Sequence, residues 1–262
     1  MIEFIKKIAV EAGKISLAEF SLLRDENIDF KNDKDIVTSA DRKVEDYIIS
    51  RIREKYPDHG IFAEESGKSS TGSRFRWVID PIDGTTSFVH GQPFYSVSIA
   101  LQEDGETIYA AVNAPRLNEL FWAEKGRGAF CNGEKMSVTR RDRLINSVLS
   151  TGFACLRANL PENNLPYFCK IAPRLRGIRR YGSAAIDLAY VASGRLEGFW
   201  EFELKPYDIA AGVLLVEEAG GHVCDFKGGK NYPEEGTVAT NGKITTELLD
   251  LFGGKHSAQT NL

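Results

Sequence analysis

The segment that most constrains this chain is residues 77–88, which read WVIDPIDGTTSF. Trp77, Val78 and Ile79 are aromatic or β-branched, which is typical of a buried strand. Pro81 cannot donate a hydrogen bond to a neighbouring strand, so we expect the sheet to stop there. The carboxylates Asp80 and Asp83 therefore leave the strand within one turn of chain. A fold that accommodates this segment must bring two negative charges together at the end of a buried strand.

Mg²⁺ prefers hard oxygen ligands, and this segment offers two carboxylates and the free carbonyl of Ile82. Waters and a substrate phosphate would complete the coordination shell of the ion. Gly84 allows close backbone approach, and a helix beginning at Thr85 or Thr86 would direct its unpaired N–H groups to the same space. The segment thus predicts a cation site beside a phosphate site. Asp-Pro and Asp-Gly are also ordinary turn dipeptides, and this segment alone fits an N-cap at Asp83 as well.

Other acidic residues stand in similar positions. Glu64 follows the apolar run at residues 61–63, and Asp208 opens a strongly apolar segment of helical character at residues 206–219. An isolated Asp at a helix start is an N-cap more often than a ligand. Several carboxylates at strand and helix ends nevertheless favour a shared site.

The motifs occur in the order found in one family. They are DIVTSAD at residues 35–41, EES at 64–66, DPIDGTT at 80–86, GAFCNG at 128–133, GSAA at 182–185, and PYDIAAG at 206–212 followed by EAGG at 218–221. Over nearly its whole length the chain resembles the inositol monophosphatase family of Mg²⁺-dependent, Li⁺-sensitive phosphatases, and within it a bacterial or archaeal inositol-1-monophosphatase. The resemblance implies an α/β fold, the layered αβαβα sandwich of inositol monophosphatases and fructose-1,6-bisphosphatases.

The resemblance also implies a ligand set and catalytic roles. One Mg²⁺ would be held by Glu64, Asp80 and the Ile82 carbonyl, and a second Mg²⁺ by Asp80, Asp83 and Asp208. Glu64 would also contact a third, more weakly held Mg²⁺, so the site would contain two or three ions. Thr85 would hold the attacking water with its hydroxyl bonded to Asp41, and Glu64 would accept the proton of that water. One ion would then lower the pKa of a bound water, which attacks the phosphate, and the other would stabilise the charge on the leaving oxygen.

Substrate contacts follow from the same resemblance. The phosphate would bind the N–H groups of Gly84 and Thr85, beside Asp83 and Asp208. The polyol would contact Gly182, Ser183, Ala184 and Glu201. For Ser183 the alternative is a simple helix N-cap, and for Glu201 an outward-facing strand residue. The expected reaction is hydrolysis of myo-inositol 1-phosphate or a similar small polyol or sugar phosphate. The alternatives are fructose-1,6-bisphosphatase or histidinol-phosphatase activity, or a non-catalytic partner role in transcription and RNA processing.

Composition sets limits on this interpretation. With 262 residues and 42% hydrophobic content, the chain is expected to form a single domain, residues 1–262, with lobes at about 1–144 (metal and phosphate) and 145–262 (substrate recognition). Residues 1–20 predict an amphipathic helix and not a signal peptide, and no apolar run is long enough to span a membrane. Four scattered cysteines and the absence of a CxxC pair indicate a reduced, cytoplasmic protein. The family resemblance implies a homodimer.

A net charge of −4 argues against direct nucleic-acid binding. Arginines cluster at residues 140–143 and 174–180, and solvent-facing or interface arginines are favoured over a second phosphate site. The four histidines share no metal-ligand spacing.

Periodicity predicts the remaining elements. These are a helix beginning near residue 39, an antiparallel meander with strands at 96–101, 108–112 and 120–123, a strand at 147–151, a helix at 183–192, a strand at 196–202 and a helix at 208–219. Residues 67–76 read as a short polar loop.

Overall fold

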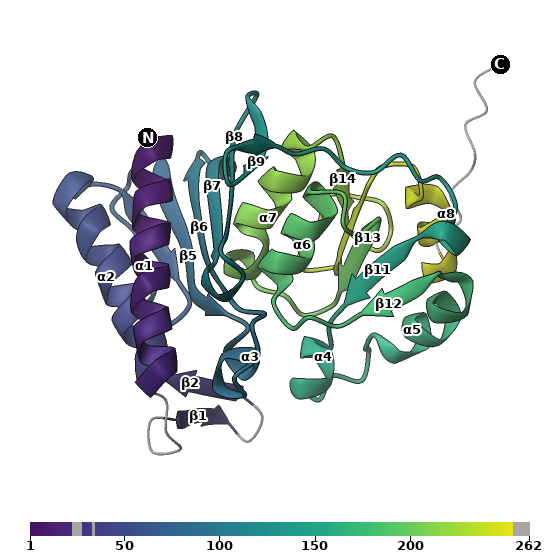
Figure 1. The fold of residues 1–262 in the computed structure, drawn as a ribbon, viewed down its shortest axis with the longest axis horizontal. Helices are drawn as coiled ribbons and strands as arrows, with labels where there is room; N and C mark the ends of the chain where they lie inside the picture. Colours follow the sequence, from purple (N-terminus) through teal and green to yellow (C-terminus); the bar gives the residue numbers. More distant parts are fainter. Residues whose placement is uncertain (23–27, 33–34, 254–262) are drawn as a thin grey trace.

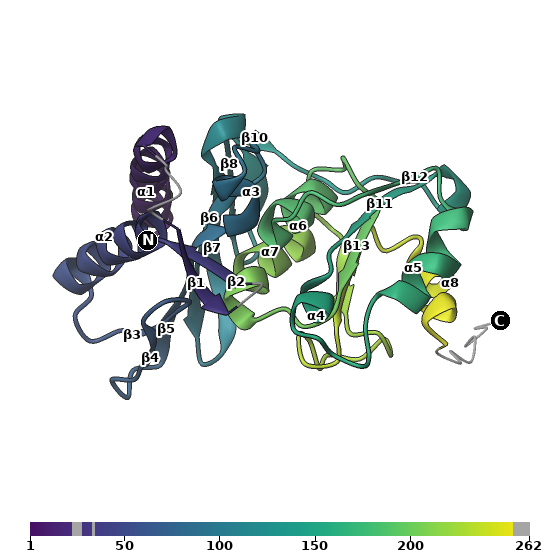
Figure 2. The same ribbon diagram turned by 90° about the horizontal axis from the view of Figure 1, so that it is seen from below.

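The computed structural model describes residues 1–22, 28–32 and 35–253. Its helices and sheets form five alternating layers, which are seen edge-on in Figure 1 and from below in Figure 2. The first layer is a pair of helices, α1 (Ile2–Leu22) and α2 (Ser39–Lys55). Ile5, Ile8 and Ala12 of α1 are at most 2% exposed, because this apolar face packs on the first sheet. Both predicted N-terminal helices are confirmed.

The second layer is an eight-stranded sheet of order β10-β9-β8-β7-β6-β5-β3-β4. Its strands are β3 (Gly60–Ala63), β4 (Gly67–Ser69), β5 (Phe75–Asp83), β6 (Ser96–Glu103), β7 (Glu106–Ala114), β8 (Glu119–Glu124), β9 (Gly128–Cys131) and β10 (Glu134–Lys135). The antiparallel meander from β5 to β10 confirms the prediction, whereas β4 pairs with β3 inside the segment that reads as a loop.

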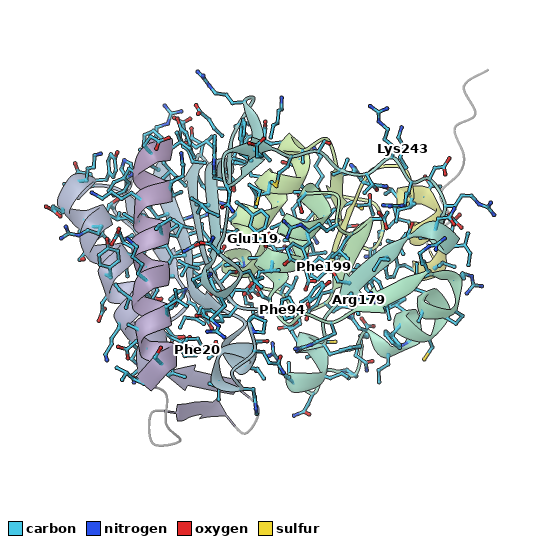
Figure 3. All side chains as sticks on the ribbon, in the orientation of Figure 1. Phe20, Phe94, Glu119, Arg179, Phe199 and Lys243 are labelled. Atoms are coloured by element: carbon cyan, nitrogen blue, oxygen red, sulfur yellow. The ribbon has the colours of Figure 1, made fainter. Side chains whose placement is uncertain are left out.

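The third layer consists of α6 (Ala184–Ala192) and α7 (Pro206–Glu218), which lie between the two sheets. All nine residues of α6 are buried, because a helix with a sheet on either side needs apolar residues around its whole circumference. One continuous core joins α6 and α7 to strands of both sheets and includes Phe199, labelled in Figure 3.

The fourth layer is a five-stranded sheet of order β12-β11-β13-β15-β14. Its strands are β11 (Val148–Thr151), β12 (Gly177–Arg179), β13 (Gly198–Glu201), β14 (His222–Cys224) and β15 (Thr237–Thr240). The fifth layer contains α5 (Leu165–Ile171) and α8 (Thr245–Phe252), which pack on the outer face through Trp200, Phe226 and their neighbours. The layered αβαβα fold is therefore as predicted; the division into lobes near residue 144 stays a prediction.

Smaller elements complete the described chain. They are the hairpin of β1 (Ile28–Asn32) and β2 (Asp35–Thr38), the short helices α3 (Thr85–Val89) and α4 (Ala154–Arg157), and 3-10 turns at Pro115–Leu117, Leu144–Asn146 and Ala172–Arg174. In the described part of the chain, no helix is both long and apolar enough to cross a membrane. All four cysteines carry free thiols, as expected.

The expectation that the sheet stops at Pro81 is wrong. Strand β5 continues to Asp83, and its pairing with β6 passes from Asp80–Ser98 to Asp83–Ser96 through an irregularity in register. A bulge places the residue that lacks an N–H where the ladder needs no donor. As a result both aspartates are held by the sheet, which fixes their positions more tightly than a turn would.

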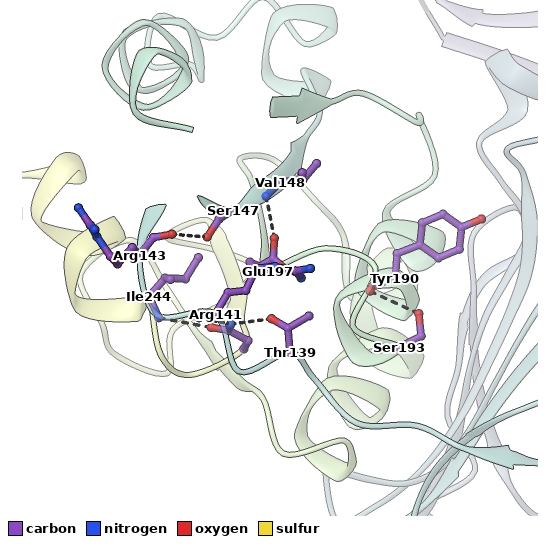
Figure 4. Close-up of polar contacts among 10 residues, drawn as sticks. Thr139, Arg141, Arg143, Ser147, Val148, Tyr190, Ser193, Glu197 and Ile244 are labelled. Carbon is purple, nitrogen blue, oxygen red and sulfur yellow. Dashed lines mark hydrogen bonds and ion pairs between the residues drawn. The ribbon is translucent and has the colours of Figure 1, made fainter. Parts of the chain in front are cut away.

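The segment that connects the two sheets is anchored by Glu197, which is 1% exposed (Figure 4). Its carboxylate accepts from the Val148 N–H at 2.7 Å and pairs with the Arg141 guanidinium at 2.7 Å. The side chain of Arg141 is exposed, in agreement with the expectation of a solvent-facing arginine, and its guanidinium also neutralises a buried carboxylate. Loss of Arg141 would leave that charge buried without its partner.

Candidate active site

The first two carboxylates of the site are brought together by parallel pairing of β3 and β5. Ala63 lies opposite Ile79, so Glu64, which directly follows β3, and Asp80, which lies within β5, are neighbours near the same end of the sheet. The Glu64 N–H donates to the Ile79 carbonyl at 3.2 Å, which extends the ladder to the acidic residue itself. The carboxyl ends of adjacent parallel strands are a usual place for a binding site in α/β proteins.

Asp83 anchors α6 as well as facing the site. Its Oδ2 accepts from the Ser183 hydroxyl at 2.5 Å and from the Ala185 N–H at 2.7 Å, and its Oδ1 from the Ala184 N–H at 3.3 Å. These donors are otherwise unpaired at a helix start. Asp83 therefore connects the end of β5 to the first turn of a helix about 100 residues further along the chain.

Asp208 completes a compact acidic group. It lies in the first turn of α7, where its Oδ2 accepts from the Lys205 N–H at 2.6 Å. One oxygen from each of Asp80, Asp83 and Asp208 lies within 4.8 Å of the others. The Oδ1 of Asp80 is buried and has no hydrogen-bond partner among the described residues. An oxygen cluster with an unsatisfied buried member fits a hard divalent cation, which supplies the missing charge and the missing contact.

The protonation of the cluster agrees with this fit. Burial, and then repulsion from Glu64 and Asp83, raise the pKa of Asp80 well above its ordinary range. Burial and repulsion from Asp83 do the same to the pKa of Asp208. The pKa of Asp83 is raised by burial to about 6, although its hydrogen bonds from Ser183 and Ala185 oppose the shift. Without cations these carboxylates repel one another, so bound cations would be held with additional strength.

Thr85 and Asp41 form the predicted pair beside the cluster. The Thr85 hydroxyl lies 3.3 Å from Asp41 Oδ1 and 3.1 Å from the Ile82 carbonyl. Asp41 Oδ2 accepts from the N–H and hydroxyl of Thr38, the N-cap of α2, at 2.9 and 2.7 Å. Burial raises the pKa of Asp41 to about 6, against the opposing effect of these bonds. The Thr85 hydroxyl therefore donates its proton within the protein, and its oxygen lone pairs can accept a hydrogen bond from a water.

These residues line a cavity of about 230 Å³. Its walls come from both sheets and from the helices between them, and they comprise Glu64, Asp80, Ile82, Asp83, Gly84, Thr85, Thr86, Gly152, Ala154, Arg157, Ala158, Arg180, Gly182, Ala184, Glu201, Glu203, Leu204, Lys205, Tyr207 and Asp208. Gly84 has a φ of +94°, and a Cβ there would lie 2.9 Å from the Phe94 carbonyl and 3.0 Å from the Gly182 carbonyl. Only glycine fits this position.

Glu201 does not face outward. It ends β13 with 6% exposure, accepts from the Ala154 N–H at 3.0 Å, and lines the cavity. A Cβ on Gly152 would lie 2.0 Å from its Oε2, so Gly152 makes room for this carboxylate. Burial raises the pKa of Glu201 to about 7. The outward-facing alternative for Glu201 is therefore wrong.

Ser183 behaves as the N-cap of α6. Its hydroxyl accepts from the Ile186 N–H at 3.2 Å while donating to Asp83, and the residue is 1% exposed. Unlike its neighbours Gly182 and Ala184, it does not line the cavity. The side chain of Ser183 therefore serves the helix and Asp83, and any contact with substrate falls to its neighbours.

The sequence interpretation did not identify the basic residues of the cavity. Arg157 ends the four-residue helix α4, which has no periodic signal. Arg180 is exposed, as expected of a solvent-facing arginine, and it also lines the cavity. Arg180 stands two residues before the glycine of the GSAA motif, and that proximity was the available signal.

Comparisons with known proteins agree with the geometry. The family model for the inositol monophosphatase family matches residues 1–254. An inositol-1-monophosphatase from Mesorhizobium japonicum is 37% identical, over 95% of this chain and 94% of its own length. Nus factor SuhB from Pseudomonas aeruginosa is 42% identical, over 95% of this chain and 94% of its own length. The structure of inositol monophosphatase from Anabaena is similar with a TM-score of 0.87 and 36% identity, covering 96% of this chain and 94% of that one. The chain belongs to the inositol monophosphatase family.

Proposed function

We propose that this protein is a Mg²⁺-dependent phosphatase of small polyol or sugar phosphates, with myo-inositol 1-phosphate as the first substrate to test. The observation that carries the proposal is the group of Asp80, Asp83 and Asp208 within 4.8 Å on the wall of a cavity. Family membership supports phosphatase chemistry in general. The small cavity favours a compact substrate, because sites for drug-sized ligands usually measure about 300–1,000 Å³.

The cations would be held by Glu64, Asp80 and the Ile82 carbonyl, and by Asp80, Asp83 and Asp208. Glu64 stands outside the 4.8 Å group but lines the same cavity, in keeping with a ligand of a neighbouring ion. When bound, Mg²⁺ lowers the pKa of a coordinated water and stabilises charge on the leaving oxygen.

The protein's own groups would orient the reactants. Thr85 accepts a hydrogen bond from the attacking water, since its proton is donated to Asp41 or to the Ile82 carbonyl. Glu64 lines the cavity next to Asp80 and would take the proton of that water. The N–H groups of Gly84 and Thr85 would hold the phosphate in line with the water, so the residues contribute mainly by positioning.

The leaving group would be recognised by the residues next to Gly84 and Asp83 and by Glu201. Gly182 and Ala184 would contact it through their backbone, and Glu201 would accept from its hydroxyls. A buried carboxylate discriminates among alcohols, because it loses a hydrogen bond when the matching hydroxyl is absent. The same site would admit fructose 1,6-bisphosphate or histidinol phosphate as alternative substrates.

The test is phosphate release from a panel of inositol 1-phosphate, fructose 1,6-bisphosphate and histidinol phosphate, with Mg²⁺ and with EDTA. We expect turnover of at least one ester that requires Mg²⁺ and is lost in Asp80→Asn. Turnover unaffected by EDTA, or kept by Asp80→Asn, would contradict the metal assignment.

A second candidate function is that of a Nus factor, a name that several relatives carry, such as the one from Pseudomonas aeruginosa. Such a role would depend on surfaces and not on turnover. Asp80→Asn would then restore growth to a strain that lacks the gene as well as the unaltered protein does, whereas a purely catalytic role requires that it fail. A homodimer remains an expectation from the family, and the mass of the protein in solution tests it.

A further inference from the structure

Helix α2 buries two carboxylates that lie one helical turn apart. Asp41 and Glu45 are 1% and 3% exposed, and residues four apart project from the same face of a helix. The proposed mechanism uses Asp41, which accepts from the Thr85 hydroxyl, and it does not use Glu45. Burying a carboxylate is costly unless its oxygens are bonded, so the partners of Glu45 indicate what this residue is for.

Both oxygens of Glu45 bind the turn that carries Glu64. Its Oε2 accepts from the Glu65 N–H at 2.9 Å, and its Oε1 accepts from the Ser66 N–H at 2.8 Å. Among the described residues, these two N–H groups are its only hydrogen-bond partners, and no basic side chain forms an ion pair with it. Glu45 therefore connects α2 to the two backbone groups that directly follow a proposed metal ligand.

The turn lies at the edge of the first sheet. Glu64, Glu65 and Ser66 connect β3 to β4, an edge strand of three residues, two of which are exposed. Segments in such places move more than the interior of a sheet. The Glu64 N–H is tied to the Ile79 carbonyl, and the next two N–H groups are tied to Glu45. These bonds restrict the turn, and with it the direction in which the Glu64 side chain faces the cavity.

The chemistry of the contact explains why a carboxylate is buried here. A carboxylate accepts at both oxygens, whereas the amide of a glutamine accepts at one end and donates at the other. Hydrogen bonds to an ionised acceptor are also stronger than those between neutral groups. One face of α2 thus holds two parts of the site in a fixed relation, Thr85 through Asp41 and the turn of Glu64 through Glu45.

Resting on the proposed phosphatase function, we infer that Glu45 is a positioning residue for the metal ligand Glu64. Its two bonds to the turn direct the Glu64 carboxylate toward the cation that Glu64, Asp80 and the Ile82 carbonyl would hold. Groups that orient a metal ligand affect metal affinity strongly, and their loss typically weakens binding by about 10–100-fold. The ion held by the compact group of Asp80, Asp83 and Asp208 does not depend on this turn.

The test is calorimetric titration of the purified protein with Mn²⁺ in the absence of substrate. The variants are Glu45→Gln, which keeps the size of the side chain but replaces one acceptor by a donor, and Glu45→Asp, which keeps the charge but withdraws the carboxylate by one methylene. Glu64→Gln and the double variant Glu45→Gln/Glu64→Gln complete a double-mutant cycle. Asp46→Asn is the control, because it removes an exposed charge from the next position of the same helix.

We expect the unaltered protein to bind at least two Mn²⁺ ions. In both Glu45 variants one ion should bind about 10-fold or more weakly, and the other should change by less than about 3-fold. In the Glu64→Gln background, Glu45→Gln should add less than about a 2-fold change, because the ligand that it positions is already absent. The Mg²⁺ concentration for half-maximal hydrolysis of inositol 1-phosphate should rise in the Glu45 variants, while KM for the ester at saturating Mg²⁺ stays the same. Asp46→Asn should bind Mn²⁺ as the unaltered protein does.

The outcomes separate positioning from a general effect on the fold. The retained Mn²⁺ ion reports that a variant is folded, and if Glu45→Gln does not fold, Glu45→Asp decides. The inference is wrong if both Glu45 variants bind Mn²⁺ normally, if both ions weaken equally, or if Glu45→Gln costs as much in the Glu64→Gln background as alone. No Mn²⁺ binding by the unaltered protein, or full binding by Glu64→Gln, would instead contradict the metal assignment of the proposed function.

Discussion

Asp80 and Asp83 lie three residues apart in one motif, yet the structure predicts different effects on stability when each is changed to asparagine. Asp80 has an unpartnered buried oxygen and is surrounded by other carboxylates. Asp83 accepts three hydrogen bonds at the start of α6. In the cation-free protein, Asp80→Asn should therefore remove repulsion only, whereas Asp83→Asn removes repulsion and an anchor.

The magnitudes follow from the distances. Asp80 has two carboxylates within 4.8 Å, and two unit charges at that separation repel by about 1 kcal/mol in water and about 3.5 kcal/mol at an effective dielectric constant of 20. Since raised pKa values leave the cluster partly protonated, we expect Asp80→Asn to stabilise by about 1–3 kcal/mol. Asp83→Asn replaces one acceptor by a donor, and a lost charged hydrogen bond costs about 1.5–3 kcal/mol. Its net effect should be near zero or destabilising.

Thermal unfolding in EDTA at neutral pH measures the difference. Asp80→Asn should raise Tm by about 2–4 °C per kcal/mol, and Asp83→Asn should not. Asp46→Asn, on the exposed face of α2, is the control and should change stability by less than about 0.5 kcal/mol. Added Mg²⁺ should stabilise the unaltered protein through binding, and Asp80→Asn far less. A lower Tm for Asp80→Asn, or equal shifts for both variants, would refute this reasoning.

Four further outcomes are expected. Thr85→Ala should lower kcat by about 10²-fold with little change in the Mg²⁺ requirement, while Thr85→Ser keeps the hydroxyl and most of the rate; equal losses in both would remove the hydroxyl from the reaction. Gly152→Ala should displace the Glu201 carboxylate. Like Glu201→Gln, it should raise KM for inositol 1-phosphate more than KM for an aryl phosphate. Equal increases for both esters would contradict a role of Glu201 in binding the leaving group. Because the pKa of Asp83 in the folded protein is raised to about 6, the free energy of unfolding in EDTA should rise as pH falls through about 6. The Mg²⁺ concentration for half-maximal activity should also rise as pH falls over the same range. If neither quantity changed with pH, the raised pKa of Asp83 would be contradicted. From the family resemblance we expect Li⁺ to inhibit at saturating inositol 1-phosphate, and undiminished turnover in a Li⁺ titration at fixed Mg²⁺ would contradict this.

Much of the fold could be predicted because its elements carry strong local signals. The helices α1 and α2 have apolar residues at helical spacing, and α6 and α7 begin at recognisable start residues and end before glycines. Where the prediction failed, tertiary structure had overruled the local signal. Pro81 ends a strand in most contexts, but a bulge opposite β6 lets β5 continue past it. Strand β4 is three residues of polar sequence whose pairing is set by β3.

The candidate site shows the same division. Glu64, Asp80, Asp83, Thr85 and Asp208 stand at the ends of predictable elements, and the structure brings them to one cavity. Arg157 was not identified because α4 is too short to leave a periodic pattern, and because its distance from Glu201 depends on folding. The side chain of Ser183 could not be assigned from sequence, since an N-cap and a substrate contact require the same residue type; its bonds to Asp83 and Ile186 decide for the cap.

The most direct test of the central claim is a crystal structure with Mn²⁺ in place of Mg²⁺, in which anomalous scattering locates the cation. We predict a peak within about 2.5 Å of carboxylate oxygens of Asp80, Asp83 and Asp208, the reach of coordination by a hard cation. Crystals of Asp80→Asn grown in the same way should lose that peak. Saturating Mn²⁺ with no peak between these three residues, or an unchanged peak in Asp80→Asn, would contradict the account.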